Sequence, residues 1–120
     1  MDDRIHFIKH RGKPILLLDA SHVTPQQMLL LLEYVQITVA KHARESLLVL
    51  GDFTGTKIDR TVATRIKEVL TLDRPFVKKT AWVGAENIPH ALMESFHSFS
   101  QREIVLFKTR EEAMDWLVEE

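Results

Sequence analysis

The side chains best suited to chemistry in this chain lie between positions 51 and 60. Two glycines, two threonines and two cations fall in this stretch, directly after the apolar run at residues 47–50. Because these residues precede a helical pattern, their backbone amides and cations could receive an anion or the polar surface of a partner. A solvated turn with a helix cap explains the same residues, and both interpretations stay open. The candidate loop comprises Asp52, Thr54, Gly55, Thr56, Lys57, Asp59 and Arg60.

The sequence contains no complete catalytic motif. A nucleotide-binding P-loop needs Gly, four residues and then Gly-Lys-Ser or Gly-Lys-Thr, whereas three residues separate Gly51 from Gly55. Asp19, Ser21 and His22 carry the chemical groups of a hydrolytic triad, but they are too close in sequence to align as one, and no Gly-x-Ser-x-Gly elbow occurs. We therefore expect no catalytic residue and a non-enzymatic protein.

Three residues have a spacing that could suit a metal ion. His90, Glu94 and His97 follow each other at i, i+4 and i+7, which places them on one side of a predicted helix. A fourth ligand is not apparent, and a solvated polar helix face explains the same spacing. We predict no metal and no cofactor, although the sequence leaves open whether this trio ever binds a metal.

Composition is that of an ordinary globular protein and narrows the choice of partner. The 120 residues, 45% of them hydrophobic, suffice for the core of a single domain over residues 1–120. A formal net charge of −1 creates no field for nucleic acid or an anionic membrane. No apolar run reaches the roughly 20 residues of a membrane-spanning helix. Without Cys or a secretory signal, the sequence favours a cytoplasmic location.

The first part of the chain predicts an antiparallel hairpin. Hydrophobic residues alternate over residues 5–10, and a continuous apolar run covers residues 14–19, with Arg11 and Gly12 between them. A continuously apolar strand is typical of one that is buried on both faces. We expect the second arm to lie inside the sheet.

Helix caps and apolar runs predict the remaining elements. Thr24-Pro25-Gln26-Gln27 has capping-box spacing, and the helix that it begins is expected to run to about residue 43. The later helix that follows Asn87 and Pro89 is expected to bury Leu92, Met93, Phe96 and Phe99. Further helices are predicted after Asp59 and Thr109, and strands at residues 47–50, 78–84 and 104–107.

The resulting order is β-β-α-β-α-β-α-β-α. Strands that alternate with helices favour an α/β fold with a mostly parallel sheet, to which the leading hairpin adds an antiparallel edge. Ligand and partner sites in such folds gather at the carboxyl ends of the strands. The loop at residues 51–60 is at such an end.

The first helix contains more apolar residues than one contact face needs. We consider Met28, Leu29 and Leu32 a candidate face for a protein partner or a homodimer. Burial of the same residues against the sheet and a neighbouring helix is an equally good explanation.

Two segments of the chain have a distinctive pattern. The first is Leu-Leu-Val-Leu-Gly-Asp-Phe-Thr-Gly at residues 47–55, a strand that ends in Asp, an apolar residue and a hydroxyl. The second is Val-Leu-Phe-Lys-Thr-Arg-Glu-Glu-Ala-Met-Asp-Trp-Leu at residues 105–117, a strand followed by a helix. These segments resemble the STAS family, and in particular its SpoIIAA-like branch of small bacterial anti-sigma-factor antagonists, to whose terminal strand and helix the second segment is similar. With the element order, the resemblance covers nearly the whole chain.

The resemblance implies a regulatory protein-binding module without catalysis. Many relatives are switched by phosphorylation of a hydroxyl in an Asp-Ser-Ser-Gly motif, which matches Asp59-Arg60-Thr61-Val62 here. Only Asp59 and the hydroxyl of Thr61 agree, so Thr61 is the candidate phosphosite. An alternative function is binding of an anionic or lipid-like small molecule by the loop cations and an apolar pocket beside the first long helix.

Overall fold

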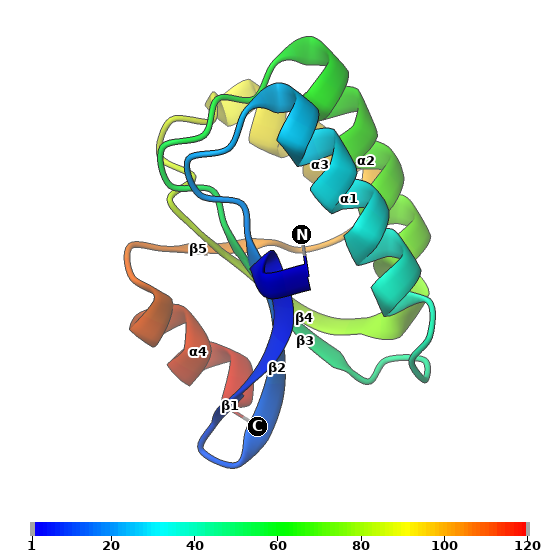
Figure 1. The fold of residues 1–120 in the computed structure, drawn as a ribbon, viewed down its shortest axis with the longest axis vertical. Helices are drawn as coiled ribbons and strands as arrows, with labels where there is room; N and C mark the ends of the chain where they lie inside the picture. The colour runs from blue at the N-terminus through cyan, green and yellow to red at the C-terminus, as the bar shows by residue number, and fades with distance from the viewer. Residues whose placement is uncertain (1, 120) are drawn as a thin grey trace.

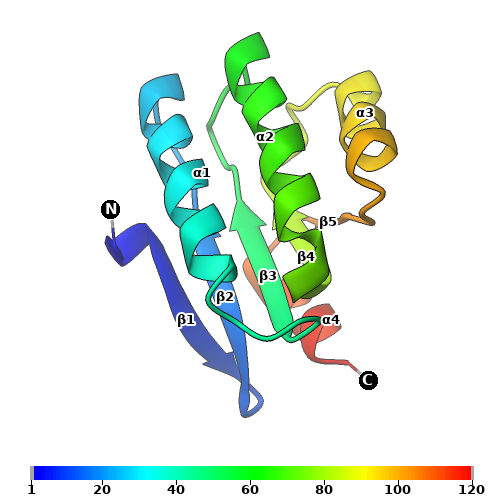
Figure 2. The same cartoon turned by 90° about the vertical axis from the view of Figure 1, so that its right-hand side faces the viewer.

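The computed structural model describes residues 2–119 and contains one five-stranded sheet and four α-helices (Figures 1 and 2). The predicted element order is confirmed. The strands are β1 (Ile5–His10), β2 (Lys13–Asp19), β3 (Leu47–Asp52), β4 (Val77–Val83) and β5 (Val105–Phe107). The helices are α1 (Pro25–Val39), α2 (Arg60–Asp73), α3 (His90–Ser100) and α4 (Arg110–Val118).

The strands lie in the order β1-β2-β3-β4-β5. β1 pairs with β2 in antiparallel fashion, and every other pair is parallel, as predicted. The hairpin turns at Arg11 and Gly12, whose φ angles of 52° and 79° are those of a two-residue turn that matches the sheet twist. The register sets Asp19 at the end of β2 opposite Asp52 at the end of β3.

The helices form a layer on each side of the sheet (Figure 2). Each step from β2 to β5 adds a parallel strand in the same direction, so right-handed crossovers place α1, α2 and α3 on one face. After β5, α4 returns across the other face, where Ala113 and Leu117 pack on Ile15, Leu17 and Leu50.

The core confirms that β2 is buried on both faces. Ile15 and Leu17 point toward α4, while Leu16 and Leu18 point toward the three-helix side, and all four are at most 5% exposed. Trp82 packs against Phe53 and Phe96 between the sheet and the helices, with ring centroids 4.6 and 5.9 Å apart. These contacts anchor the ends of β3 and β4, where the candidate loop begins.

The predicted caps are also confirmed. The Thr24 hydroxyl accepts a hydrogen bond from the Gln27 N–H, and the Gln27 side chain accepts one from the Thr24 N–H, which completes a capping box. Asp59 and Thr109 accept the corresponding bonds at α2 and α4. Pro89 precedes α3 without a side-chain cap.

The first helix is shorter than predicted, and it buries residues that were predicted to face a partner. It ends at Val39 rather than near residue 43, because the next amides turn back to carbonyls three residues earlier and the chain returns to β3. Met28 and Leu32 are at most 4% exposed and Leu29 is half-buried, so the predicted partner face at these residues is wrong. They belong to the apolar face through which α1 packs against the sheet and against α2.

Phe99 is a second correction. It is 59% exposed, whereas Phe96 of the same helix is fully buried. α3 packs mainly beside α2, so the turn that carries Phe99 faces away from the core. In the part of the chain that the structure describes, no helix has the length and apolar character to span a membrane.

Candidate functional site

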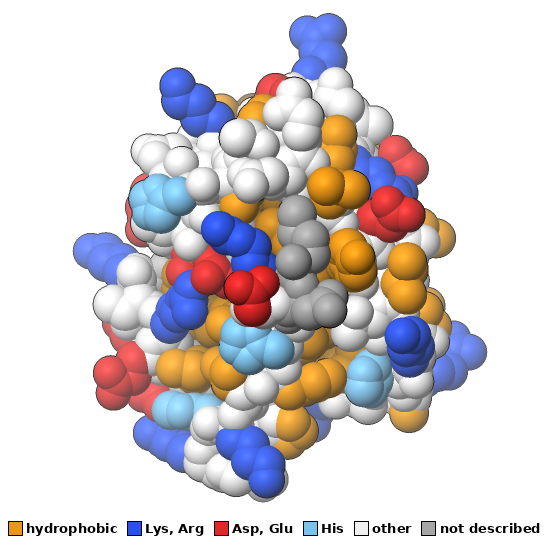
Figure 3. Space-filling model, viewed as in Figure 1, with side chains coloured by type: hydrophobic (Ala, Val, Ile, Leu, Met, Phe, Trp, Pro, Cys, Tyr) orange, Lys and Arg blue, Asp and Glu red, His pale blue; other side chains and the backbone are white. Residues whose placement is uncertain are grey.

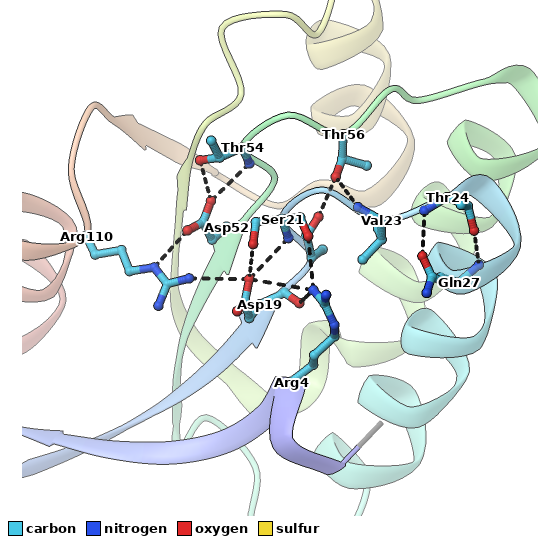
Figure 4. Close-up of polar contacts among 11 residues, drawn as sticks. Arg4, Asp19, Ser21, Val23, Thr24, Gln27, Asp52, Thr54, Thr56 and Arg110 are labelled. Carbon is cyan, nitrogen blue, oxygen red and sulfur yellow. Dashed lines mark hydrogen bonds and ion pairs between the residues drawn. The ribbon is translucent and has the colours of Figure 1, made fainter.

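Two matching polar turns lie side by side at the carboxyl edge of the sheet (Figure 4). At the end of β2, Asp19 Oδ1 accepts hydrogen bonds from the Ser21 N–H and hydroxyl, at 3.1 and 2.6 Å. At the end of β3, Asp52 Oδ1 accepts the same pair of bonds from Thr54, at 3.0 and 2.6 Å. Each strand therefore ends in an aspartate that orders the hydroxyl residue two positions later.

Arg110 joins the two turns. Its Nε donates to Asp52 Oδ2 at 2.7 Å, and its Nη2 lies 3.3 Å from Asp19 Oδ1. This arginine is the first residue of α4, so the helix on the far face of the sheet reaches the loop edge. Arg4 completes the cluster from the other side, because its Nη1 donates to the carbonyls of Asp19 and Ser21, each at 3.0 Å.

These contacts keep Asp19 ionised. Its partial burial alone raises the pKa, but the hydrogen bonds from Ser21 and the charges of Arg110 and Arg4 outweigh burial and hold the pKa of Asp19 below its ordinary value. Asp52 is almost buried, with 9% of its side chain exposed, and its ion pair with Arg110 compensates its charge. The polar groups under the loop thus satisfy one another.

Backbone and hydroxyl contacts fix the shape of the loop above this cluster. The buried Thr56 hydroxyl donates to the Ala20 carbonyl at 2.6 Å and accepts from the Val23 N–H at 3.1 Å. The His22 N–H donates to the Thr54 carbonyl at 2.8 Å. The loops after β2 and β3 therefore form one unit.

Two glycines allow this close approach. Gly55 has a φ of 70°, and a Cβ at this position would overlap the imidazole of His22. Gly84, after β4, also has a φ of 70°, and a Cβ there would overlap the backbone N of Thr54. Any other residue at either position would be strained in its backbone and would displace the loop.

The predicted loop residues divide into an inner and an outer group. Asp52 and Thr56 are buried with their polar groups bonded inside the protein, so in this structure they position the loop. Asp59 caps α2 through the Val62 N–H at 2.8 Å, which is the structural role foreseen for it. The exposed outer group is Thr54, Gly55, Lys57 and Arg60.

Thr61 is exposed in the first turn of α2, two residues after the Asp59 cap. A modification there would meet little steric hindrance and would lie at the positive end of the helix dipole. Arg60 precedes it on the surface. The structure therefore brings the candidate phosphosite and the outer loop residues to the same edge of the protein.

The other sequence candidates do not assemble into sites. Ser21 donates its hydroxyl to Asp19, whereas the His22 ring lies against Gly55, so the three residues do not form a triad in line. His90 pairs with Glu94 at 3.0 Å on an exposed surface, and His97 Nδ1 contacts the Arg102 carbonyl at 2.7 Å. Among residues 2–119, no group of three His, Asp or Glu side chains could hold a metal ion.

A separate buried charge cluster lies at the opposite end of α2. Asp73 is 5% exposed, and burial raises its pKa to about 7 despite the nearby charges of Arg102 and Arg65. Arg102 is 8% exposed and donates to the Leu70 carbonyl and the Thr80 hydroxyl. Burial lowers the pKa of Arg102 to about 10, although Asp73 opposes this effect. The cluster ties the segment after α3 to α2 and β4.

The chain matches no protein-family model, and a comparison with curated proteins found no significant match. A solved structure is similar over almost its full length: an uncharacterised DUF3478-family protein from Shewanella loihica PV-4, described as having a SpoIIAA-like fold. The two share 17% sequence identity with a TM-score of 0.65, over 94% of this chain and 91% of that one. This chain has a SpoIIAA-like fold.

The SpoIIAA-like fold agrees with the resemblance of residues 47–55 and 105–117 to the STAS family. At 17% identity the similarity concerns the fold and not the activity. It shows that the α/β prediction, with its leading hairpin and its final helix, was right.

Sequence reasoning missed the two arginines of the SpoIIAA-like domain's polar edge. Arg110 is 58 residues from Asp52, and Arg4 is 15 residues from Asp19. The sequence pattern that could have indicated these arginines is Asp-x-Ser after one strand and Asp-x-Thr after the adjacent strand. Two carboxylates on neighbouring strand ends need a cation between them, and Arg110 opens the helix after the last strand.

Proposed function

We propose that this chain is a non-enzymatic regulatory module that binds a protein partner through residues 51–61 at the carboxyl edge of the sheet. The observation that carries the proposal is the division of this loop into a bonded interior and an exposed cationic exterior. Arg110, Arg4 and Thr56 fix the interior, and Lys57 and Arg60 project from it. A preorganised surface loses little conformational entropy when a partner binds.

The charge of the outer group indicates the kind of partner surface that would fit. Lys57 and Arg60 are exposed cations, and the only acidic side chain between them, Asp59, is engaged as a helix cap. An acidic patch with hydroxyl or amide groups would complement this surface. The SpoIIAA-like fold supports the proposal by analogy with the anti-sigma-factor antagonists that the sequence resembles.

The hydrogen bonds and ion pairs of Asp19 and Asp52 favour binding over catalysis. A general base needs a pKa near the working pH and a free lone pair aimed at a substrate. The pKa of Asp19 lies below its ordinary value, and both Asp19 and Asp52 are engaged by Arg110 and by their own hydroxyl residues. Asp19 is therefore not poised to take a proton, and both oxygens of Asp52 are occupied by Thr54 and Arg110.

Phosphorylation of Thr61 is the regulatory part of the proposal. A phosphate there would add negative charge beside the cationic surface of Lys57 and Arg60 and would reduce its attraction for an acidic partner. The first turn of α2 would tolerate that charge because of the helix dipole. We therefore expect phosphorylation to release the partner while the fold remains intact.

The alternative function, binding of a lipid-like ligand beside α1, gains no support from the cavity there. The apolar cavity between α1, α2 and the sheet has a volume of about 40 Å³. Ligand pockets usually measure several hundred Å³, roughly ten times more. The cavity belongs to the packing of the core.

The proposal is tested by a comparison of two charge-reversed proteins. In one, Lys57 and Arg60 are both replaced by Glu; in the other, the exposed Lys78 and Arg74 at the opposite end of the fold are replaced in the same way. Both changes alter the net charge equally. Affinity capture from the native host should recover a partner with the wild type and the second variant but not with the first. Equal recovery by both variants would refute the assignment of the site.

The switch is tested separately with Thr61→Glu and Thr71→Glu. Both threonines are exposed on α2, one in its first turn and one near its far end. Thr61→Glu should weaken binding of the recovered partner, whereas Thr71→Glu should leave the affinity close to that of the wild type. If the two variants bind equally well, phosphorylation of Thr61 is not the switch, although the loop could still be the binding surface.

A further inference from the structure

We propose that the free edge of β1 pairs with the β1 strand of a second copy of this chain. The pairing would be antiparallel about a two-fold axis and would join the two sheets into one. This surface lies on the side of β1 and α1, away from residues 51–61, so the inference is independent of the proposed partner site.

The two edges of the sheet differ in their protection. β5 is an edge strand of three residues, which is too short to pair stably with a strand of another chain. β1 has six residues and pairs with β2 without a register shift. Exposed edges in monomers are usually interrupted by Pro, by a bulge or by charged residues. β1 contains no Pro and no bulge, and Lys9 is its only residue with a permanent charge.

The hairpin geometry sets the backbone groups that β1 offers. A two-residue turn makes His10 and Lys13 a hydrogen-bonded pair, and bonded and non-bonded pairs alternate from there. Phe7 and Leu16 are therefore a non-bonded pair. The N–H and carbonyl groups of Ile5, Phe7 and Lys9 point to the open edge, ready to pair with another strand.

Apolar side chains gather beside this edge. Figure 3 shows hydrophobic side chains over α1 and along β1 on the face of the molecule that carries the edge. Phe7 of β1 is 43% exposed, and Tyr34 of α1 is 44% exposed. Leu30 and Ile37, about half exposed, continue the stripe of Tyr34 at helical spacing. Among residues 2–119, four of the seven exposed large hydrophobic residues thus belong to β1 and α1, which marks an association surface rather than scattered exposure.

The sequence of β1 complements itself when two copies pair antiparallel about Phe7. Phe7 then faces Phe7 of the second copy, Lys9 faces Ile5, and His6 faces Ile8. Within the strand, no two cations oppose each other. The edge can therefore accept a second copy of itself without repulsion between charges.

The two α1 helices would flank the new strand pair. Paired strands are about 4.8 Å apart, so the space over the two β1 strands lies between the helices and needs side chains to fill it. Phe7 and Tyr34 from both copies are the exposed side chains available there. Their burial would add the apolar area that strand pairing alone lacks.

The test is the mass of the protein in solution, measured by sedimentation or light scattering. The wild type should have twice the 13.9 kDa of one chain. Phe7→Pro removes an outward N–H without removing a bond to β2, and Phe7→Lys adds a charge while keeping the backbone. Both variants should fall to the mass of one chain with unchanged circular dichroism, whereas Phe99→Lys, an equally drastic change on α3, should keep the doubled mass.

Amide hydrogen exchange provides the second measurement. The amides of Phe7 and Lys9 should be protected in the wild type and should exchange at least tenfold faster in Phe7→Lys. A wild type with the mass of one chain would overturn the proposal. So would a dimer that survives both Phe7 variants, a dimer lost in Phe99→Lys, or a single chain that holds a different polypeptide on β1.

Discussion

Replacement of Asp73 by Asn is expected to stabilise the protein above neutral pH and to change it little in acid. Asp73 is 5% exposed at the end of α2, and its pKa is raised to about 7 because burial disfavours the carboxylate more than Arg102 and Arg65 favour it. An Asn side chain has nearly the shape of the protonated Asp. It therefore keeps the packing while removing the charge.

The pKa sets the sign and the size of the effect. The folded protein binds the Asp73 proton more tightly than the unfolded chain does. Protonation of Asp73 therefore makes its full contribution to the free energy of unfolding below pH 3.8, and this contribution is lost as the pH rises to about 7. The difference between the two pKa values corresponds to about 4 kcal/mol in total. Between about pH 5 and about pH 8, the advantage of Asp73→Asn over the wild type should grow by about 3 kcal/mol.

Urea unfolding at both pH values measures this difference directly. Asp115→Asn is the matched control, because Asp115 is a carboxyl whose pKa is lowered, chiefly by its hydrogen bond with His10. That variant should lose stability above the pKa of the carboxyl, which is the opposite sign. The reasoning is refuted if Asp73→Asn has the same advantage at both pH values, or if it is less stable than the wild type at the higher one.

Three further variants, together with the control Thr54→Val, test the polar edge of the sheet by the same unfolding measurement. Arg110→Met should cost about 3 kcal/mol because it leaves the buried Asp52 carboxylate without its cation; a cost near zero would show that water replaces the arginine. Thr56→Val should cost about 1–3 kcal/mol because two buried backbone groups lose their partner, whereas the exposed Thr54→Val should cost less; equal costs would contradict the difference in burial. Gly84→Ala should cost at least about 1 kcal/mol because of its positive φ and the overlap with Thr54, and an unchanged midpoint would contradict this geometry.

The parts of the fold that could be predicted from the sequence are those with local signals. The Thr24 capping box needs only residues within one helical turn, and the continuous apolar run of β2 reports burial on both faces. Such signals established the element order and hence the parallel sheet. The candidate loop was found for the same reason, because a strand end, a glycine and a helix cap follow each other within ten residues.

Other features depend on contacts between distant segments. The sequence does not indicate that Arg110 reaches Asp52, since the contact depends on where α4 begins relative to β3. The burial of Met28 and the exposure of Phe99 depend on how far each helix is covered by its neighbours. Periodicity defines an apolar face, but the packing partner decides how wide that face is.

The most direct test of the proposed binding surface is site-specific photo-crosslinking in the native host. A photoreactive amino acid replaces Lys57 in the loop in one protein and Lys78 at the opposite end in another; both positions are exposed. The proposed function predicts a discrete crosslinked protein from position 57 that is absent from position 78. A crosslink from position 78 alone, or none from position 57, would contradict a partner site at the carboxyl edge of the sheet.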